Sequence, residues 1–411
     1  MDLPRRQARR ALSLLAQRQA GRAAPAASSV TLLGDLRATA DARGWPYRRV
    51  AGATIQAREP SRLLAEDAAW LLLNGKRAIR EHTQTSLTGD LARGEMYYTH
   101  LLSATRYPLP ETFVCEVPDA LVCSPLGGVL TDRGEAVAQS AVRGVLEPLP
   151  PLVDVPAPAE RIEGTVLPLL GWGAETNYGH WLIDVLPRLS LLDELPGDLR
   201  IGVASPLPAF QAASLELLGI AADRLVPLDA GWHRLERALV CFAAERSTVP
   251  HRDHLERLRD RLVAGAFAGS APARPGRRIF VSRERSRRPL ANEAELAPLL
   301  ERYGFEICRP EELDVGGQVR LFAEASLIVG QNGTGMLNEL YCPAGATVIE
   351  IMHPVYWHHD ICRIAAVLGH RHWSVFAEDA GDGFASRIDP RKLEKVLAYA
   401  LGEGTVVDEP F

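Results

Sequence analysis

A glycine-rich loop in the last third of the chain has the residue types and spacing of a phosphate-binding turn. The segment Ser326–Asn338 contains an apolar run that ends at Gly330, and Gly333, Thr334 and Gly335 follow it. A strand, a glycine loop and a helix in this order expose backbone N–H groups at the helix start, where a phosphate can bind. Glycines also serve tight turns for steric reasons alone. We expect phosphate binding here, with the Thr334 hydroxyl as a further donor and a structural turn as the alternative.

Charged residues flank this loop in the sequence. Arg283 and Arg288 follow a predicted strand, and guanidinium groups donate in a geometry that suits phosphate oxygens. Glu350 lies near the carboxyl end of another predicted strand, where an acidic side chain can accept from ribose hydroxyls. Because only three Lys occur, nearly all the basic charge is Arg. The alternatives are therefore a solvated loop for the two Arg residues and a structural ion pair with an Arg for Glu350.

A histidine and an aspartate in the middle of the chain are candidates for a general base. His180 and Asp184 lie four residues apart in a predicted helix and so share one face of it. An imidazole can take a proton from a hydroxyl near neutral pH, and Asp184 either orients the ring or is itself the base. Asn177 and Arg188 flank the pair, and we expect them to bind the second substrate. The structural alternatives are a helix-start histidine bonded to backbone and an Arg188 that neutralises Asp184.

Several residues towards the C-terminus suggest a metal site by type but not by spacing. They are His353, His358, His359, Asp360, His370 and His372. No pair shows the spacing of a recognised helical zinc motif, and adjacent histidines point in different directions from a helix. We expect no bound metal and no cofactor. Tyr356 and Trp357 are expected in the core, with stacking on a sugar or base as the alternative.

Composition excludes several classes of protein. The 411 residues are 47% hydrophobic, which is enough for two or three domains. The net charge of -5 argues against a general nucleic-acid binder, and no apolar run approaches the length of a membrane span. The six Cys include no C-x-x-C pair, which indicates buried free thiols in a reducing compartment, and hence a cytoplasmic location.

The basic N-terminal segment, residues 1–15, lacks the apolar core of a signal peptide. It is expected either to fray as a solvated helix or to lie on an anionic membrane surface as a basic amphipathic helix. Peripheral membrane contact is therefore one of two expectations for this segment.

The apolar pattern divides the chain into three parts. Residues 1–150 have a helical start and short apolar runs that predict a small antiparallel sheet, at 113–117, 120–123, 128–131 and 136–140. A Pro-rich stretch at 146–158 and a second linker at 270–276 separate the parts 160–268 and 276–411. In these two parts strands alternate with helices. We therefore expect an α/β fold with two Rossmann-like domains and a cleft between them, after a small N-terminal α/β region.

The positions of the individual elements follow from periodicity. The expected strands are 165–170, 201–204, 224–228, 238–242, 278–282, 305–308, 327–330, 347–352 and 373–376. The expected helices are 178–195, 208–218, 251–268, 292–303, 311–325, 357–368 and 390–401, together with a helix after the glycine loop. Pro187 should kink or divide the first of these helices.

Three ordered segments resemble the family 61 glycosyltransferases, the group that contains bacterial capsular-polysaccharide biosynthesis proteins. The first is Asn177–Leu189. The second is Phe280–Arg283 with Arg288 and Asn292–Leu296, and the third is Gln318, Phe322 and Val329–Asn338, ending at Val348–Ile351. No single motif is decisive, but the ordered set is fairly specific.

The resemblance implies a GT-B fold and an inverting transfer from a nucleotide sugar, usually a UDP-sugar, to a glycan acceptor, without an obligatory metal. We expect donor binding by one set of residues: Arg283, Arg288, Asn332, Gly333, Thr334, Gly335 and Glu350. The donor domain would be 276–411 and the acceptor domain 160–268. In the family's glycine loop a His usually stands where this chain has Asn332, so an amide here replaces an imidazole.

Two other functions stay open at this point. One is a nucleotide-sugar epimerase of similar fold, which converts the sugar without an acceptor. The other is a non-catalytic protein that keeps the fold and binds a glycan or a partner protein, and the Asn332 substitution leaves room for it.

Overall fold

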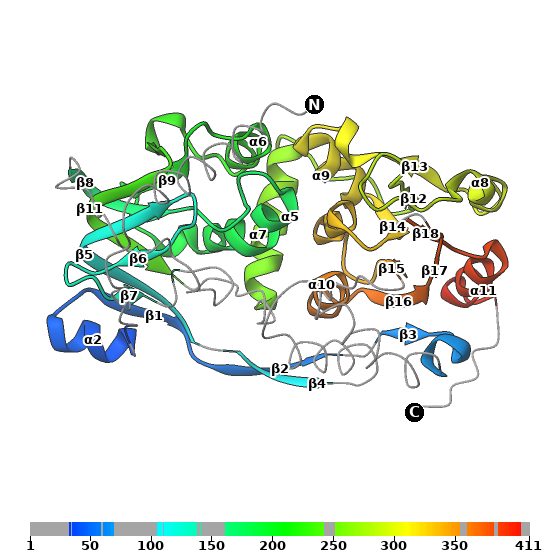
Figure 1. The fold of residues 1–411 in the computed structure, drawn as a ribbon, viewed down its shortest axis with the longest axis horizontal. Helices are drawn as coiled ribbons and strands as arrows, with labels where there is room; N and C mark the ends of the chain where they lie inside the picture. The colour runs from blue at the N-terminus through cyan, green and yellow to red at the C-terminus, as the bar shows by residue number, and fades with distance from the viewer. Residues whose placement is uncertain are drawn as a thin grey trace. The chain divides into compact units, whose positions relative to one another are not determined.

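The computed structural model describes residue 33 and residues 35–58, 61–69, 105–109, 111–137, 140, 161–241, 251–353, 360–381 and 385–403. The chain forms two compact units (Figure 1). Unit 1 comprises residues 1–54 and 109–248, and unit 2 comprises residues 55–108 and 249–411. The basic segment 1–15, the Pro-rich stretch 146–158 and residues 356–359 lie outside the described residues, so the expectations for them stay predictions.

Unit 2 is built on a six-stranded parallel sheet in the order β13-β12-β14-β15-β16-β3. Its strands are β3 (Arg62–Leu63), β12 (Arg277–Val281), β13 (Glu306–Cys308), β14 (Ala325–Gln331), β15 (Thr347–Met352) and β16 (Arg371–Phe376). Every residue of β15 is buried, as expected for a parallel strand covered on both faces. From β12 onward the strands occupy the spatial order 2-1-3-4-5 of a doubly wound sheet. The predicted parallel α/β architecture is confirmed for this unit.

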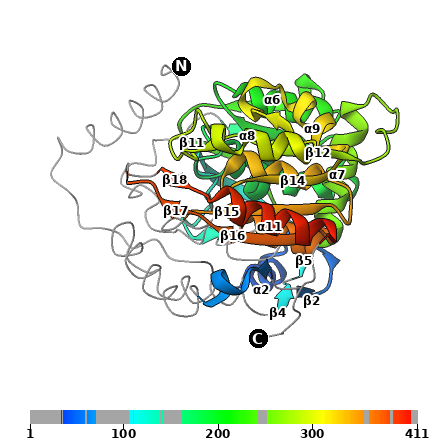
Figure 2. The same cartoon turned by 90° about the vertical axis from the view of Figure 1, so that its right-hand side faces the viewer.

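Helices cover the sheet of unit 2 in two layers. They are α7 (Arg252–Ala266), α8 (Glu293–Arg302), α9 (Val315–Ala323), α10 (Asp360–Leu368) and α11 (Pro390–Leu401), with the 3-10 helices η5 (Pro310–Glu312) and η6 (Thr334–Tyr341). Helices α8 and α11 lie side by side (Figure 2) and bury their leucines against the strands, among them Leu296 and Leu397. Helices α7, α9, α10 and η6 contact one another in the second layer. Two short strands, β17 (Glu378–Asp379) and β18 (Ser386–Arg387), pair beside them.

Local capping explains where these helices begin and end. The side chain of Asp314 precedes α9 and accepts from the Gly317 N–H, a standard N-cap. Asp389 caps α11 in the same way, and Pro390 occupies the first turn, where its missing N–H costs nothing. Gly402 ends α11 with a φ of 81°, the left-handed conformation that favours glycine.

Unit 1 contains one mixed sheet in the order β10-β9-β8-β11-β5-β6-β7, with β1 also paired to β5. Its strands are β1 (Tyr47–Ala51), β5 (Thr112–Ser124), β6 (Val129–Leu130), β7 (Ala136–Val137), β8 (Arg161–Pro168), β9 (Arg200–Ala204), β10 (Leu225–Leu228) and β11 (Gly231–Cys241). The pairs among β8, β9, β10 and β11 are parallel, whereas the others are antiparallel. Helices α2 (Leu36–Arg43), α6 (Ala209–Leu217) and η4 (Ala222–Arg224) belong to this unit.

The expected small N-terminal sheet is not separate from the next domain. The runs 113–117 and 120–123 form the single strand β5, because Pro118 and Asp119 do not interrupt it. β5 then pairs along β11, so the antiparallel strands and the parallel ones share one sheet and one core. A two-stranded ribbon of β2 (Thr54–Arg58) and β4 (Thr105–Leu109) forms where the chain passes between the units.

Two segments belong to unit 2 although the sequence pattern placed the unit after residue 276. Helix α7, expected in the 160–268 domain, packs on α9, α10 and η6, and Arg320 Nη1 donates to the Ala266 carbonyl at 3.0 Å. Residues 61–69 also join unit 2: β3 extends the sheet beside β16, and Asp67 Oδ2 accepts from the Phe376 N–H at 3.1 Å. Periodicity identifies an amphipathic helix but not the partner that its apolar face meets.

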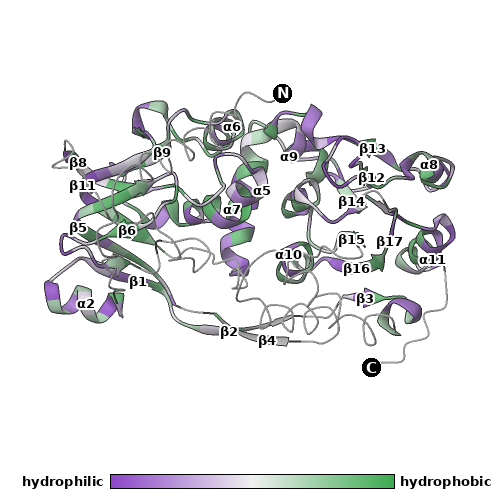
Figure 3. Ribbon diagram, in the orientation of Figure 1, coloured by the Kyte–Doolittle hydropathy of each residue, from purple (hydrophilic) through white to green (hydrophobic). Residues whose placement is uncertain are grey.

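Burial follows the hydropathy of the strands. Figure 3 shows apolar colour along β5 and β6 and polar colour on α2 and α7. All six cysteines are free and buried, which confirms the predicted free thiols. Among the described helices, none combines the length and the apolar character that crossing a membrane requires.

Candidate active site

The expected phosphate loop lies where the winding of the unit 2 sheet reverses. β12 and β14 are neighbours, but the chain leaves β12 towards β13 on one side and reaches β14 on the other. In doubly wound sheets ligands bind at the carboxyl ends of the two strands that flank such a reversal. Here those ends lead into Arg283 and into Gly333, which are therefore the first residues to consider.

Arg283 and Gly333 are in direct contact. A Cβ added to Gly333 would lie 1.3 Å from Arg283 Nη1 and 2.5 Å from its Cζ, so the guanidinium occupies the space that any other residue at 333 would need. Arg283 Nε donates to the Arg288 carbonyl at 3.2 Å. The structure thus brings together the two predicted donor-site residues that lie fifty positions apart in the sequence, and Arg288 orients Arg283 through its backbone.

Glu293, the first residue of α8, fixes the turn that carries Arg283. Its carboxylate accepts from the Arg283 N–H and from the Ser282 hydroxyl, both at 2.6 Å. Burial raises the pKa of Glu293 above its ordinary value, and the two hydrogen bonds oppose that shift. Glu293 has no role among the sequence-based predictions, although a carboxylate at a strand-to-helix turn is a signal that the sequence contains.

The glycines of the loop have different structural roles: Gly330 and Gly335 allow close packing, and Gly333 and Gly335 are partly exposed. A Cβ at Gly330 would lie 2.6 Å from Met336 Sδ, and one at Gly335 would lie 3.0 Å from Val281 Cγ1, so both allow close packing of β12, β14 and η6. Gly333, Thr334 and Gly335 are partly exposed, whereas Met336 and the rest of η6 are buried. The solvent-accessible backbone of the loop is therefore at residues 333–335.

The sequence predicts that Glu350 accepts from ribose hydroxyls, which requires an accessible carboxylate, but the structure buries this side chain. Its side chain is 0% exposed, and it accepts from Asn332 Nδ2 and from His372 Nε2, the latter at 3.1 Å. His372 Nδ1 in turn contacts Ser61 Oγ at 2.8 Å. Glu350 thus belongs to a buried network with Asn332, His372 and Ser61 that positions the Asn332 side chain, which differs from the predicted structural alternative, an ion pair with an Arg.

A second buried pair joins Glu339 of η6 to His370. Glu339 and His370 approach to 3.5 Å, but burial raises the pKa of Glu339 well above its usual value, and burial lowers the pKa of His370 to about 4. Both shifts favour the neutral forms, so the contact joins a carboxylic acid to a neutral imidazole and is not an ion pair.

Acid should destabilise the protein through His370. Between pH 6.5, the ordinary pKa, and about 4, the unfolded chain binds a proton on this residue that the folded protein excludes, which removes up to about 3 kcal/mol of stability. His370→Gln should therefore lose less stability than the original protein over this range. Urea unfolding of both proteins above pH 6.5 and near pH 4 measures the free energy of unfolding at each pH. Equal losses of stability in the two proteins would contradict the assignment of the acid effect to His370. Glu339 is present in both proteins, so its own protonation does not distinguish them.

The expected absence of a metal stays a prediction. Within the described ranges no group of three or more His, Cys, Asp or Glu side chains is arranged to hold an ion. His370 and His372 contact separate carboxyl groups, and His358 and His359 lie outside those ranges.

In unit 1 the predicted helix 178–195 is broken into three short turns. α5 (Tyr178–His180) is followed by a π-helical turn, η2 (Trp181–Val185), and by the 3-10 helix η3 (Leu186–Glu194). Pro187 sits in the first turn of η3, which confirms that it divides the segment. Single π turns recur at functional sites, and this one begins directly after His180 and contains Asp184.

In this segment the two candidate general-base residues, His180 and Asp184, are in contact. His180 Nδ1 and Asp184 Oδ2 are 2.8 Å apart, and both residues are buried, with His180 6% exposed. The carboxylate fixes the ring orientation and leaves Nε2 as the nitrogen that can exchange a proton. Asn177 caps α5, because its Oδ1 accepts from the Gly179 N–H at 2.8 Å. The Asn177 side chain therefore has a structural role as the cap of α5, and its predicted role in acceptor binding stays a prediction.

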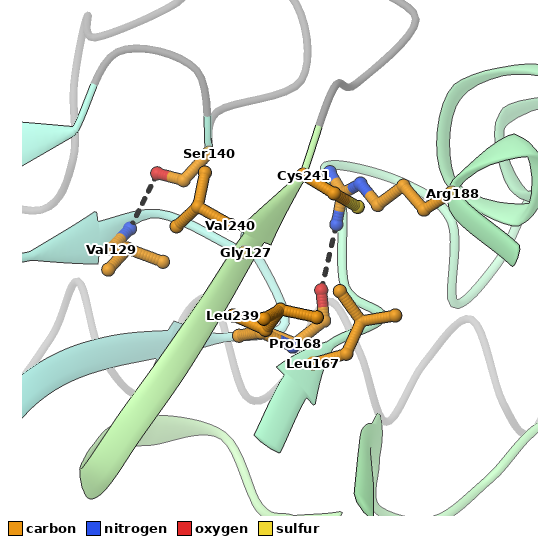
Figure 4. A pocket seen from close by; sticks show the side chains of 9 residues that line it. All are labelled: Gly127, Val129, Ser140, Leu167, Pro168, Arg188, Leu239, Val240 and Cys241. Atoms are coloured by element: carbon orange, nitrogen blue, oxygen red, sulfur yellow. Dashed lines mark hydrogen bonds between the residues drawn. The ribbon is translucent and has the colours of Figure 1, made fainter. Parts of the chain in front are cut away.

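Arg188 has a structural position. It is 4% exposed, and its Nη1 donates to the carbonyls of Pro168 and Leu170, at 2.8 and 3.0 Å. Figure 4 shows the guanidinium between β8 and Cys241, beside a cavity of about 10 Å³, which is the size of one water molecule. An acceptor cannot enter such a space, so Arg188 holds the end of β8 and is not placed to bind an acceptor directly.

Removing this clamp should cost stability. Arg188→Met leaves two buried carbonyls without their donor, and we expect the free energy of unfolding to fall by about 2–4 kcal/mol. Arg200→Met is the control, because Arg200 Nη1 makes an exposed bond to one carbonyl, that of Glu163, and its loss should cost at most about 0.5 kcal/mol. Urea denaturation compares the two, and equal stabilities would refute the clamp.

Comparison with known proteins gives one family match. Residues 178–349 match the model of a family described as Glycosyltransferase 61. The matched span contains His180 and Asp184 in unit 1 and Arg283 and Gly333 in unit 2. None of the curated proteins compared with the chain matches it.

Proposed function

We propose that this protein is an inverting glycosyltransferase that moves a sugar from a nucleotide-sugar donor to a glycan acceptor, because residues 178–349 match the model of the Glycosyltransferase 61 family. The observation that carries the proposal, beyond the family match, is the contact of Arg283 with Gly333 at the reversal point of a doubly wound sheet. It joins a cation that suits phosphate oxygens to an accessible glycine loop.

Unit 2 is the donor half in this proposal. The guanidinium of Arg283 and the backbone N–H groups at Gly333–Gly335 neutralise the diphosphate as it leaves. Arg288 binds the guanidinium and Glu293 binds the backbone N–H of Arg283 before the donor arrives, so little reorganisation accompanies the reaction. This set supplies charge stabilisation from protein groups, which supports the metal-independent transfer that the resemblance implies.

Unit 1 is the acceptor half. His180 Nε2 takes the proton of an acceptor hydroxyl, while Asp184 stabilises the imidazolium that forms. The acceptor oxygen forms a bond to the anomeric carbon as the bond from that carbon to the phosphate oxygen breaks. The electron pair leaves with the nucleoside diphosphate, and the configuration at carbon inverts.

The remaining parts of the proposal have two sources. A UDP-linked donor, a GT-B arrangement of the two units and a role in surface or capsular polysaccharide assembly come from the resemblance. A cytoplasmic location comes from the free thiols, and peripheral membrane contact comes from the basic segment 1–15.

A nucleotide-release assay tests the proposal. The purified protein is incubated with a panel of nucleotide sugars, with and without saccharide acceptors, and free nucleotide is measured. Release that depends on acceptor supports transfer. Conversion of the sugar without release would point to an epimerase, and the absence of nucleotide binding in calorimetry would point to a non-catalytic protein.

A further inference from the structure

An exposed tryptophan stands beside the candidate base. Trp172 follows β8 and is 48% exposed, and it is the only aromatic among the exposed large hydrophobic side chains of the described residues. Its ring meets that of His180 edge to face, with centroids 5.5 Å apart and an interplanar angle of 74°. About half of an indole therefore faces solvent directly next to the group that we assign as the base.

The loop that carries Trp172 is held rigidly on both sides. Arg188 binds the carbonyls of Pro168 and Leu170 before it. Gln211 Nε2, from α6, donates to the Ala174 carbonyl after it at 2.9 Å. Gly173, with a φ of 72°, lets the loop lie against the His180 ring. A surface side chain on an anchored loop is preorganised, which is a property of binding sites.

A carboxyl group lies in the same loop. Glu175 precedes α5, which carries His180, and burial raises the pKa of the Glu175 carboxyl above its ordinary value. Its Oε2 is buried and has no hydrogen-bond partner among the described residues. Glu175 as a whole is only partly buried, so a ligand hydroxyl can approach its carboxyl group and donate a hydrogen bond to it.

We propose that Trp172 and Glu175 form a subsite for a sugar ring of the acceptor. A pyranose presents a face of C–H groups and a rim of hydroxyls, so the indole stacks on the face while Glu175 accepts from the rim. A ring held there has its hydroxyls within reach of His180. The inference deepens the proposed function and rests on it, because it takes the acceptor to be a saccharide and His180 to be the base.

The test measures acceptor kinetics with methyl glycosides of common hexoses and N-acetylhexosamines, which carry no aromatic aglycone that could stack on the indole in place of the sugar. Trp172→Ala should raise the acceptor KM about 10-fold and leave donor affinity unchanged. Trp172→Phe should recover most of the loss, because the aromatic face is kept. Glu175→Gln should also raise the acceptor KM. Ile307→Ala, which removes a hydrophobic side chain that is 50% exposed on unit 2, is the control.

The outcomes separate this inference from the proposed function. An unchanged acceptor KM in Trp172→Ala, with acceptor-dependent release intact in the original protein, overturns the subsite and leaves the transferase standing. If the original protein shows no acceptor-dependent release, the proposed function fails. Saturation-transfer NMR with the same glycosides then decides the subsite: signals lost in Trp172→Ala support it, and equal or absent signals overturn it. Thermal unfolding of each variant shows that it is folded.

Discussion

Replacing His180 by Ala is expected to lower kcat by about 10²–10⁴-fold, the usual contribution of a positioned general base. The donor Kd should stay nearly constant, because His180 lies in unit 1 and the residues that we assign to the donor lie in unit 2. Asp184→Asn should also reduce kcat, since an amide cannot stabilise the imidazolium as a carboxylate does. Initial rates of nucleotide release with saturating acceptor, together with donor calorimetry, measure both effects.

A second histidine of the same unit provides the control. His233 on β11 bonds through Nε2 to the Asp229 carbonyl and contributes nothing to the proposed site, so His233→Ala should retain full activity. An unchanged rate in His180→Ala would remove this residue from the mechanism. A parallel loss in donor affinity would show that the substitution disturbs more than the proton transfer.

The sequence predicts the fold well where the hydrophobic pattern is compatible with only one secondary structure. In unit 2 the short apolar strands and the amphipathic helices alternate cleanly, and β15 and α11 have the bounds that periodicity predicts. Parallel strands joined by helices align their carboxyl ends, so the proximity of residue 283 to residue 333 follows from the architecture alone. The loop after β12 and the glycine loop could therefore be assigned to one site without coordinates.

Other features depend on contacts that no local pattern encodes. The two residues of β3 are too few to show periodicity. They join the sheet because Ser61 and Asp67, on either side of β3, form hydrogen bonds with residues of β16. The segment after Asn177 has a helical pattern, but a π turn and a 3-10 helix replace the regular helix. Its hydrogen-bond pattern is set by tertiary packing, which overrides weak helical propensity.

Glu350 illustrates how the sequence gives the strand but not the environment of one side chain. An acidic residue among Val348, Ile349 and Ile351 suggested a ligand contact, but residues on both faces of a central strand are buried. The carboxylate instead accepts from Asn332 and His372. The amide at 332 is thus held by protein groups, which fits a role in shaping the loop and explains why Asn can occupy this position.

Gly333→Ala should raise the donor Kd by about 10–100-fold, because its Cβ would displace the Arg283 guanidinium and remove a charge-assisted contact to the diphosphate. Arg283→Ala should have an effect of similar size. In the double variant the two losses should not add, since both act through the same guanidinium. Calorimetry with the nucleoside diphosphate on the four proteins measures this coupling.

A second glycine separates this mechanism from general loop damage. A Cβ at Gly276 would have the Arg274 carbonyl oxygen as its nearest neighbour, at 3.9 Å, so Gly276→Ala should leave donor affinity and stability unchanged. Full additivity in the double variant would mean that Gly333 serves the backbone conformation and not Arg283. Arg283→Lys distinguishes further: it keeps the charge but loses the planar fork. A partial loss of affinity is therefore expected if the guanidinium binds the phosphates directly.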